Sequence, residues 1–551
     1  MPSAAVLGPV VLPLVAAGVI AACGLARIDL GRVAAAAGGW SCAVALIAVW
    51  VPVRSSLELT LGQLGYGSAF DIRVDGVTFA FGLMVVLPTA VLLTLQPRAW
   101  QQSVLSMLGL TSAMAALEAG GAVLTAIAGG TAATLAMVLL DTEDPRAPRP
   151  SWGLLLAGWL ALAWVGVILQ VSGGTAVYSA VPLAAVSVPV FTLLAMAAVL
   201  ASCLFPWRTW PAQLWSRSTL RAAGVSVATL YPLGFYLLVR GYELGGGRYP
   251  HPVFNVALAM IGILAALAAA MRAQRATTRR EFLGEVIPGL GGFALMAVAL
   301  GTPLGMVAGL VLLATTSALV ACFALLPDRA GIQSLFAIAA AVGLPPGIAF
   351  GGRVIGIEAT FEAGEFLGLI GIFAAGAWAL WMVGSARALG LPGGRGHPAN
   401  ETFPRLSMAI AAVTLAAGPA LAVFQFGLAN PVVAQVMPPS AGALGGGLTS
   451  VVTVSSVLPV VTLMAPLLLM GIGIYALTGT SAIRAQVRPA IFSPAAPKGV
   501  LERMRTAARA ATVPEQYRSI LSFRELEAAA AGGSPVLWLA AVVVLAFAVT
   551  R

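Results

Sequence analysis

Long apolar runs separated by short polar gaps make up almost the whole chain. A run of about 20 apolar residues crosses the hydrocarbon core of a bilayer as a helix, because a helix satisfies its own backbone polar groups. We therefore expect an all-α, polytopic membrane protein with about sixteen transmembrane helices. The predicted spans lie near residues 5–25, 33–53, 76–96, 102–118, 120–140, 153–171, 182–204, 218–240, 252–271, 285–303, 304–326, 332–351, 365–388, 405–427, 454–478 and 535–550.

The composition supports this class. Hydrophobic residues make up 60% of the chain and charged residues only 9%, whereas a soluble domain carries about a quarter charged residues. The net charge of +10 is spread over many short gaps and forms no continuous basic face, so we expect no nucleic-acid partner. We interpret the arginines as topology determinants beside anionic lipid.

The arginines also predict an orientation, since positive charge is retained on the cytoplasmic side of a membrane. Almost all of them fall in the odd-numbered gaps between spans. The even-numbered gaps contain only Arg54, Arg73, Arg240, Arg248 and Arg353. We therefore expect a multi-pass protein of the bacterial cytoplasmic (inner) membrane with both termini on its outer face.

Motifs of soluble enzymes are missing from the sequence. The cysteines Cys23, Cys42, Cys203 and Cys322 lie inside predicted spans without CxxC or Cys/His spacing, so we expect neither a disulfide nor a metal site. We find no nucleotide-binding loop and no nucleophile constellation. The chain is therefore expected to have no catalytic residues and no cofactor of its own.

Two predicted spans contain proline where a continuous helix would not tolerate it. Span seven begins with Pro182 and contains Pro189, and span twelve contains the run Gly-Leu-Pro-Pro-Gly at 343–347. Broken helices of this kind line polar cavities or packed interiors. Because the breaks are five spans apart, we expect two inverted five-helix repeats. The predicted segments are 1–101, the repeats 102–240 and 252–388, helices fourteen and fifteen in 405–478, and a last segment at 479–551.

Several motifs resemble those of one family of membrane subunits. Residues 205–211 read FPWRTWP and residues 229–240 read TLYPLGFYLLVR, similar to FPFHTWLP and VKAGVYLLAR of the antiporter-like subunits. This family includes the large membrane subunits of complex I, of energy-converting hydrogenases and formate-linked complexes, and of Mrp-type sodium/proton antiporters. Further matches in the same order are VDG at 74–76, RREFLGEVIPGLGGF at 279–293 and GLPPGIAF at 343–350.

The resemblance implies a midplane proton relay of Glu, Lys and His residues, yet this chain has one lysine, Lys498, outside the predicted spans. Aligned by the motifs, the relay positions carry residues that cannot exchange a proton at neutral pH. The replacements are Ala201, Ser226, Pro232, Ser317 and Ala321, together with Arg208 at the histidine of the HTW motif and Arg353 at the terminal Lys or Glu.

A few charged residues could form another ion path. Arg353 is either a fixed charge within the bundle or a helix-end arginine, and we expect Glu358, Glu362 and Glu365 to be its partners. Glu118 is either a helix-end carboxylate or the mouth of a proton path. Glu285 lies in the first turns of span ten, where Arg280 could pair with it. Asp75 is expected to cap span three.

The end of the chain predicts contacts with partner subunits. Residues 481–533 are rich in Arg, Glu and Ala at helical spacing, which is typical of an amphipathic helix on a membrane surface. The resemblance implies instead a lateral helix along neighbouring membrane subunits, anchored by the last span. We therefore weigh three hypotheses: a scaffold or coupling subunit with a degenerate proton path, an active translocator with a rebuilt path, and an unrelated secondary transporter.

Overall fold

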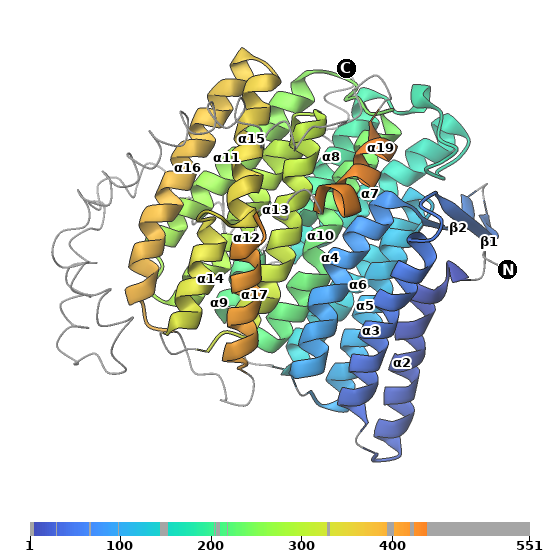
Figure 1. Ribbon diagram of the computed structural model, residues 1–551. Coiled ribbons are helices and arrows are strands. Elements are labelled where there is room, and N and C mark those ends of the chain that lie inside the picture. The colour runs from blue at the N-terminus through green and yellow to red at the C-terminus, as the bar shows by residue number, and fades with distance from the viewer. Residues whose placement is uncertain are drawn as a thin grey trace.

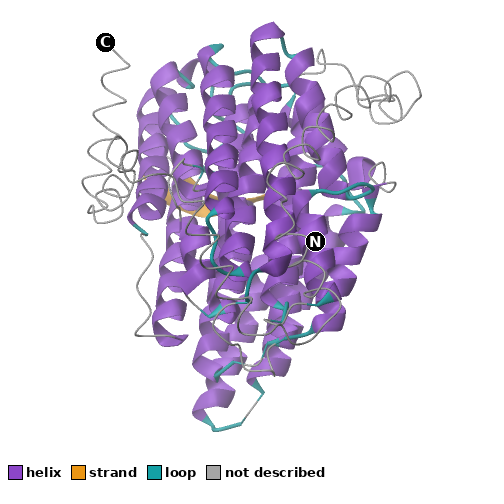
Figure 2. Ribbon diagram, turned by 90° about the vertical axis from the view of Figure 1, so that its left-hand side faces the viewer, coloured by secondary structure: helices purple, strands orange, loops and turns teal. Residues whose placement is uncertain are grey.

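The computed structural model describes residues 5–28, 30–65, 68–96, 98–143, 152–202, 204, 210–217, 219–327, 331–393, 402–418 and 424–437. This part is a bundle of roughly parallel and antiparallel helices with one small sheet (Figures 1 and 2). The first half contains α2 (Gly8–Leu25), α3 (Gly31–Trp50), α4 (Gly76–Leu95), α5 (Trp100–Glu118), α6 (Ala122–Glu143), α7 (Gly153–Gly173), α8 (Val188–Ser202), α9 (Trp210–Arg217) and α10 (Leu220–Leu244). The second half contains α11 (Val253–Gln274), α12 (Arg279–Ala299), α13 (Pro303–Ala324), α14 (Ile332–Val342), α15 (Ile348–Glu362), α16 (Glu365–Gly390), α17 (Pro404–Ala416) and α19 (Asn430–Val436).

The prediction of a polytopic helical membrane protein is confirmed for the part of the chain that the structure describes. Ten helices are long and apolar enough to cross a membrane, and three shorter apolar helices accompany them. The most deeply buried of the ten are α10 and α12, whose apolar windows are completely covered by other helices. Spans fifteen and sixteen and the segment 481–533 lie outside the described residues.

The helical bundle also carries one β-hairpin that the sequence analysis did not predict. Strands β1 (Leu57–Gly65) and β2 (Ser68–Val74) pair antiparallel, with Leu57 opposite Val74. Its signal is the alternation of leucine with polar residues in LELTL, which has the period of a half-exposed strand. We call the end of the bundle that carries β1 and β2 the hairpin end, and the other the opposite end.

The two predicted repeats contain their helices in the same order. Each has three long helices, then a broken one, then a long one: α5, α6, α7, α8 with α9, and α10 in the first, and α11, α12, α13, α14 with α15, and α16 in the second. The first set starts at the opposite end, where Arg98 precedes α5. The second starts at the hairpin end, where α11 follows the end of α10. The two sets therefore run in opposite directions.

The break in span twelve lies where the sequence predicts it. Helix α14 ends at Val342, Gly343 adopts a left-handed conformation with φ of 74°, and α15 begins at Ile348. Glycine favours this conformation because it lacks a Cβ atom.

The prolines of span seven lie where its helix begins, with a separate short turn between them. Pro182 precedes a single 3-10 turn, and Pro189 occupies the first turn of α8, where proline is tolerated because its missing N–H has no helical partner. These prolines therefore shape the start of α8.

Candidate functional site

A cluster of charged side chains lies buried at the hairpin end and joins α4 to α10. Arg240 of α10 donates to Asp75 through Nη1 at 2.7 Å and Nη2 at 2.8 Å, and to Glu243 at 2.6 Å. From β2, Arg73 Nε lies 2.8 Å from Asp75, and its Nη2 lies 3.1 Å from Glu243. Gln435 Nε2 donates to both Asp75 and Glu243. We call these five residues the hairpin-end cluster.

Local structure explains why the cluster forms here. Asp75 is the N-cap of α4 and accepts from the Thr78 amide at 2.9 Å, which confirms the predicted capping role. The Thr78 hydroxyl and the Tyr236 hydroxyl each accept from Arg240 and donate to the Leu117 carbonyl at the end of α5. One buried arginine therefore links α4, α5 and α10. The sequence carried one signal for this cluster. An acid follows Arg73 by two residues and Arg240 by three.

The charges of the cluster favour the ionised form of Asp75, which precedes the membrane-spanning part of α4. Burial of the carboxyl raises the pKa of Asp75. The Arg240 and Arg73 guanidiniums and the Thr78 amide lower it more, so that its pKa is about 2 instead of 3.8. Arg240 thus stays paired with a carboxylate at any physiological pH.

This lowered pKa predicts where the cluster loses its stabilising effect. A depressed carboxylate pKa contributes stability that is complete above the unfolded-state value and is lost as the pH falls through the folded-state value. We expect the difference in melting temperature between the wild type and Asp75→Asn to be constant from pH 8 to about pH 5 and to shrink from about pH 4 towards pH 2. Thermal unfolding of the full-length chain in detergent checks this, and a difference that shrinks near neutral pH contradicts it.

Glu118, a predicted ion-path candidate, ends α5 beside this cluster and is completely buried. Neither of its carboxylate oxygens has a hydrogen-bond partner among the described residues. The adjacent Leu117 carbonyl accepts the two hydroxyls that contact Arg240. Glu118 is therefore at a helix end, as one of the two expectations had it, but without a compensating charge.

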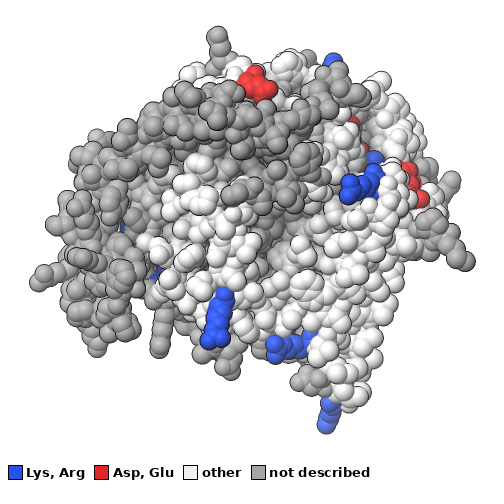
Figure 3. Space-filling view, in the orientation of Figure 1, with Lys and Arg blue, Asp and Glu red and all other residues white. Residues whose placement is uncertain are grey.

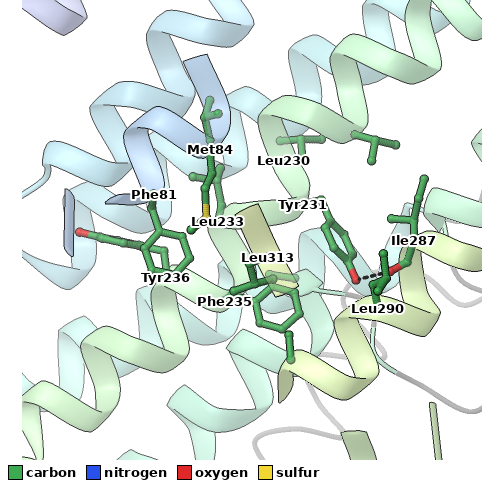
Figure 4. Close-up of a cluster of buried hydrophobic side chains, with 14 of the residues drawn as sticks. Phe81, Met84, Leu230, Tyr231, Leu233, Phe235, Tyr236, Ile287, Leu290 and Leu313 are labelled. Carbon is green, nitrogen blue, oxygen red and sulfur yellow. Dashed lines mark hydrogen bonds between the residues drawn. The ribbon is translucent and has the colours of Figure 1, made fainter. Parts of the chain in front are cut away.

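The predicted relay positions lie inside the bundle among apolar side chains. Ala201, Ser226, Pro232, Ser317 and Ala321 are all buried. Around the middle of α10, Figure 4 shows Leu230, Leu233 and Phe235 packed with Leu290 and Leu313, and the Tyr231 hydroxyl donates to the Ile287 carbonyl at 3.1 Å. These positions thus offer no side chain that titrates near neutral pH.

Arg353 occupies the break between α14 and α15, and it forms no ion pair with Glu358 or Glu362, two of its three predicted partners. It donates to the carbonyls of Val342 and Ala341, which end α14, and its guanidinium lies over the rings of Phe293 and Trp378 at 5.2 and 5.6 Å. No described acid forms an ion pair with it. Cationic side chains are stabilised by the carbonyls at a helix C-terminus. The carbonyls that end α14 therefore take the place of the expected carboxylate.

Helix geometry explains why Glu358 does not pair with Arg353. Glu358 follows Arg353 by five residues, so its side chain leaves α15 on a different face. One buried oxygen of Glu358 has no partner within the described residues. The Glu365 side chain lies outside the described part of the structure. The Glu358 candidate therefore stands apart from Arg353 and does not complete an ion path with it.

Glu285 pairs with a different arginine from the one expected. Arg272, near the end of α11, donates from Nε to Glu285 at 2.9 Å, whereas Arg280 Nε donates to the Trp215 carbonyl. The side chains of α11 and α12 meet across their tight connection, which sequence spacing alone did not reveal. Arg208, the other predicted candidate, lies outside the described residues.

A second charged cluster ties the helices together at the opposite end. Glu143, at the end of α6, lies 3.7 Å from Arg98 and 3.5 Å from Arg221, and it accepts from the Thr219 hydroxyl at 2.5 Å. The visible face in Figure 3 shows few charged residues, separated by wide white surface. The ion pairs of the described bundle lie near its two ends.

A cavity of about 450 Å³ opens beside the hairpin-end cluster. It is lined by Trp50, Arg54, Ser55, Ser56, Arg73, Asn430, Pro431, Ala434 and Gln435. The described side chains contain no group of three His, Cys, Asp or Glu residues that could hold a metal ion.

Solved structures of membrane complexes share this architecture. A chain of the Mrp complex from Dietzia sp. DQ12-45-1b matches with a TM-score of 0.71 and 19% identity over 91% of this chain. A chain of respiratory complex I from Thermus thermophilus matches with a TM-score of 0.63, 18% identity and 79% coverage, and includes 99% of that chain. The chain therefore has the antiporter-like subunit fold. The predicted multi-pass architecture and fold are confirmed.

A chain of the archaeal membrane-bound sulfane sulfur reductase also has this fold, with a TM-score of 0.65 and 15% identity over 80% of this chain and 98% of that chain. The match to the Mrp complex spans only 59% of the longer Mrp chain. No family model and no curated protein matches the sequence. At these identities the likeness establishes the fold alone, and all three neighbours are chains of membrane complexes.

Proposed function

We propose that this chain is a membrane subunit of a multi-subunit, ion-motive or redox-linked complex, complex I-like or hydrogenase-like, and that it serves as a scaffold or coupling element with a degenerate proton path. The antiporter-like fold supports the class of protein. The burial of Ala201, Pro232 and Ala321 among apolar side chains supports the loss of the path. That replacement of titratable groups within an intact bundle is the observation that carries the proposal.

Arg353 does not restore the relay in this proposal. Its guanidinium keeps its proton at any working pH, and its donors already serve the carbonyls that end α14. We therefore assign it to holding the two halves of the broken helix together.

An active proton or cation translocator is the alternative that one observation favours. Glu118 is a buried carboxylate without a partner in the described part of the bundle, as a proton carrier would be. A translocator also needs titratable groups that continue the path, and the family relay positions supply none. The third hypothesis, an unrelated secondary transporter, is disfavoured by the shared fold.

The location and partners of the chain follow from the same proposal. The arginine-rich opposite end would face the bacterial cytoplasm, which would place both termini on the outer side of the cytoplasmic membrane. Residues 481–533 and the last span would contact the other membrane subunits. Purification of the tagged full-length chain from its own membranes should then recover several further membrane proteins, and recovery of the chain alone would count against a complex.

Proton pumping by the intact complex tests the scaffold proposal. Arg353→Gln keeps amide donors for the Val342 and Ala341 carbonyls but removes the charge, so we expect the variant complex to assemble and to pump at the wild-type rate. Arg353→Ala leaves both carbonyls without their donor, and each unsatisfied buried carbonyl costs about 1–3 kcal/mol of stability. The amount of assembled complex should therefore fall. Proton uptake into inverted vesicles, normalised to the assembled complex, is the measurement. A fully assembled Arg353→Gln complex that no longer pumps would support the translocator.

A further inference from the structure

The environment of Glu118 is the most unusual feature that the proposed scaffold role leaves unexplained. Its side chain is completely buried, and both oxygens lack a hydrogen-bond partner within the described residues. An ionised carboxylate in such a site loses its hydration without gaining a partner, and even after relaxation the penalty amounts to several kcal/mol. A neutral carboxylic acid avoids most of this penalty.

Three other buried carboxylates of the chain each lie next to an arginine. Asp75 is held by Arg240 and Arg73, Glu143 by Arg98 and Arg221, and Glu285 by Arg272. Each of these acids thus has an arginine within 4.0 Å. No described arginine forms an ion pair with Glu118, although it ends a helix beside the hairpin-end cluster.

The neighbouring charges do not favour an ionised Glu118 either. Helix α5 packs against α2, α3, α4, α6, α10 and β2. At the hairpin end these elements contribute the titratable or charged groups Cys42, Asp71, Arg73, Asp75, Tyr236, Arg240, Tyr242 and Glu243. Both arginines among them already bind Asp75 and Glu243. Helix α5 itself ends at Glu118, and the negative end of its dipole further disfavours a second negative charge.

Backbone contacts hold this carboxyl in place. Its neighbour Leu117 accepts hydrogen bonds from Tyr236 at 2.7 Å and Thr78 at 3.1 Å. On the other side, Ala119 forms a β-bridge with Ile72, and the Gly120 amide donates to the Asp71 carbonyl at 2.7 Å. Glu118 therefore cannot turn outward to water without breaking these contacts.

We propose that Glu118 is a proton-binding site whose carboxyl group carries a proton at neutral pH. The ligand is a single proton, bound at one end of the bundle. This inference goes beyond the scaffold role, because one occupied carboxyl needs no relay across the membrane.

Infrared difference spectroscopy of the full-length protein tests the site. At pH 7 the wild-type minus Glu118→Gln spectrum should contain the carbonyl stretch of a neutral carboxylic acid and no carboxylate bands. Glu281→Gln is the matched control, since Glu281 lies partly exposed at the start of α12 and accepts from Thr277. Its difference spectrum should contain carboxylate bands only. Carboxylate bands in the Glu118 difference spectrum would overturn the proposal.

Thermal stability gives a second readout. Glutamine resembles a protonated glutamic acid in shape and charge, so the melting temperature of Glu118→Gln should equal that of the wild type or exceed it. A marked fall would mean that the carboxylate charge stabilises the fold and would overturn the proposal. Proton pumping is a separate measurement: unchanged pumping together with the neutral-acid band supports both the scaffold role and the proton site.

Discussion

Arg240→Met is expected to destabilise the protein by about 3–5 kcal/mol, because it removes the cation from a buried ion cluster and leaves carboxylates behind. Asp75 would lose two hydrogen bonds from Arg240, and Glu243 would lose one. The Tyr236 and Thr78 hydroxyls would lose their donor as well. A large fall in the melting temperature of the full-length chain, with less folded protein in the membrane, is the expected measurement.

Arg54→Met is the matched control. Arg54 lies at the same end of the bundle but is exposed, and exposed charges contribute little to stability. The double variant Arg240→Met with Asp75→Asn should be less destabilised than the sum of its single variants, because each change removes the charge that the other leaves unpaired. Equal losses for Arg240→Met and Arg54→Met would contradict the cluster's structural importance.

The two charged clusters hold the described bundle together at its two ends. The hairpin-end cluster joins the start of α4 to the end of α10, and the Glu143 cluster joins the start of α10 to the end of α6. Between them, α10 is packed by apolar side chains (Figure 4). A bundle held at both ends in this way does not depend on a charged side chain at the middle of α10.

The sequence predicted the features that depend on local chemistry. Spans were predictable because the thickness of a bilayer determines the length of an apolar run. Gly343 could be identified as the end of a helix because glycine before a proline pair stops helices by its own conformational preference. Asp75 was identified as a cap because an aspartate before a helix accepts hydrogen bonds from the first backbone amides. The hairpin was missed, because a short alternating run gives a weak signal beside the membrane spans.

Partners that are distant in sequence were not predictable. Asp75, Arg240 and Gln435 meet only because α4, α10 and α19 pack together at one end. Nearby acids were the obvious partners for Arg353, yet the direction of its side chain on α15 brings it to backbone carbonyls, which a sequence does not display. For Glu118, the isolation of the carboxyl becomes visible only once every neighbouring element is in place.

Gly262→Leu is expected to destabilise the protein by about 1–3 kcal/mol or more, because α11 and α12 contact each other through their backbones at this residue. A Cβ atom on Gly262 would lie 2.6 Å from the Met296 amide nitrogen and 2.7 Å from the Gly292 carbonyl oxygen. These backbone atoms of α12 cannot move aside as a flexible side chain does, so α11 and α12 must separate. Small residues commonly allow this close approach between membrane helices.

Gly376→Leu is the matched control, since a Cβ atom on this residue of α16 meets nothing within 4 Å among the described atoms. Both substitutions add the same side chain to the interior of a long apolar helix, where leucine is also a better helix former than glycine. The control should therefore keep or raise the melting temperature of the full-length chain, while Gly262→Leu lowers it. Arg272 of α11 and Glu285 of α12 form an ion pair beside the connection of these two helices. Separation of α11 from α12 should therefore also expose the buried Glu285 carboxylate. Equal melting temperatures for the two variants would show that α11 and α12 are not in backbone contact at Gly262.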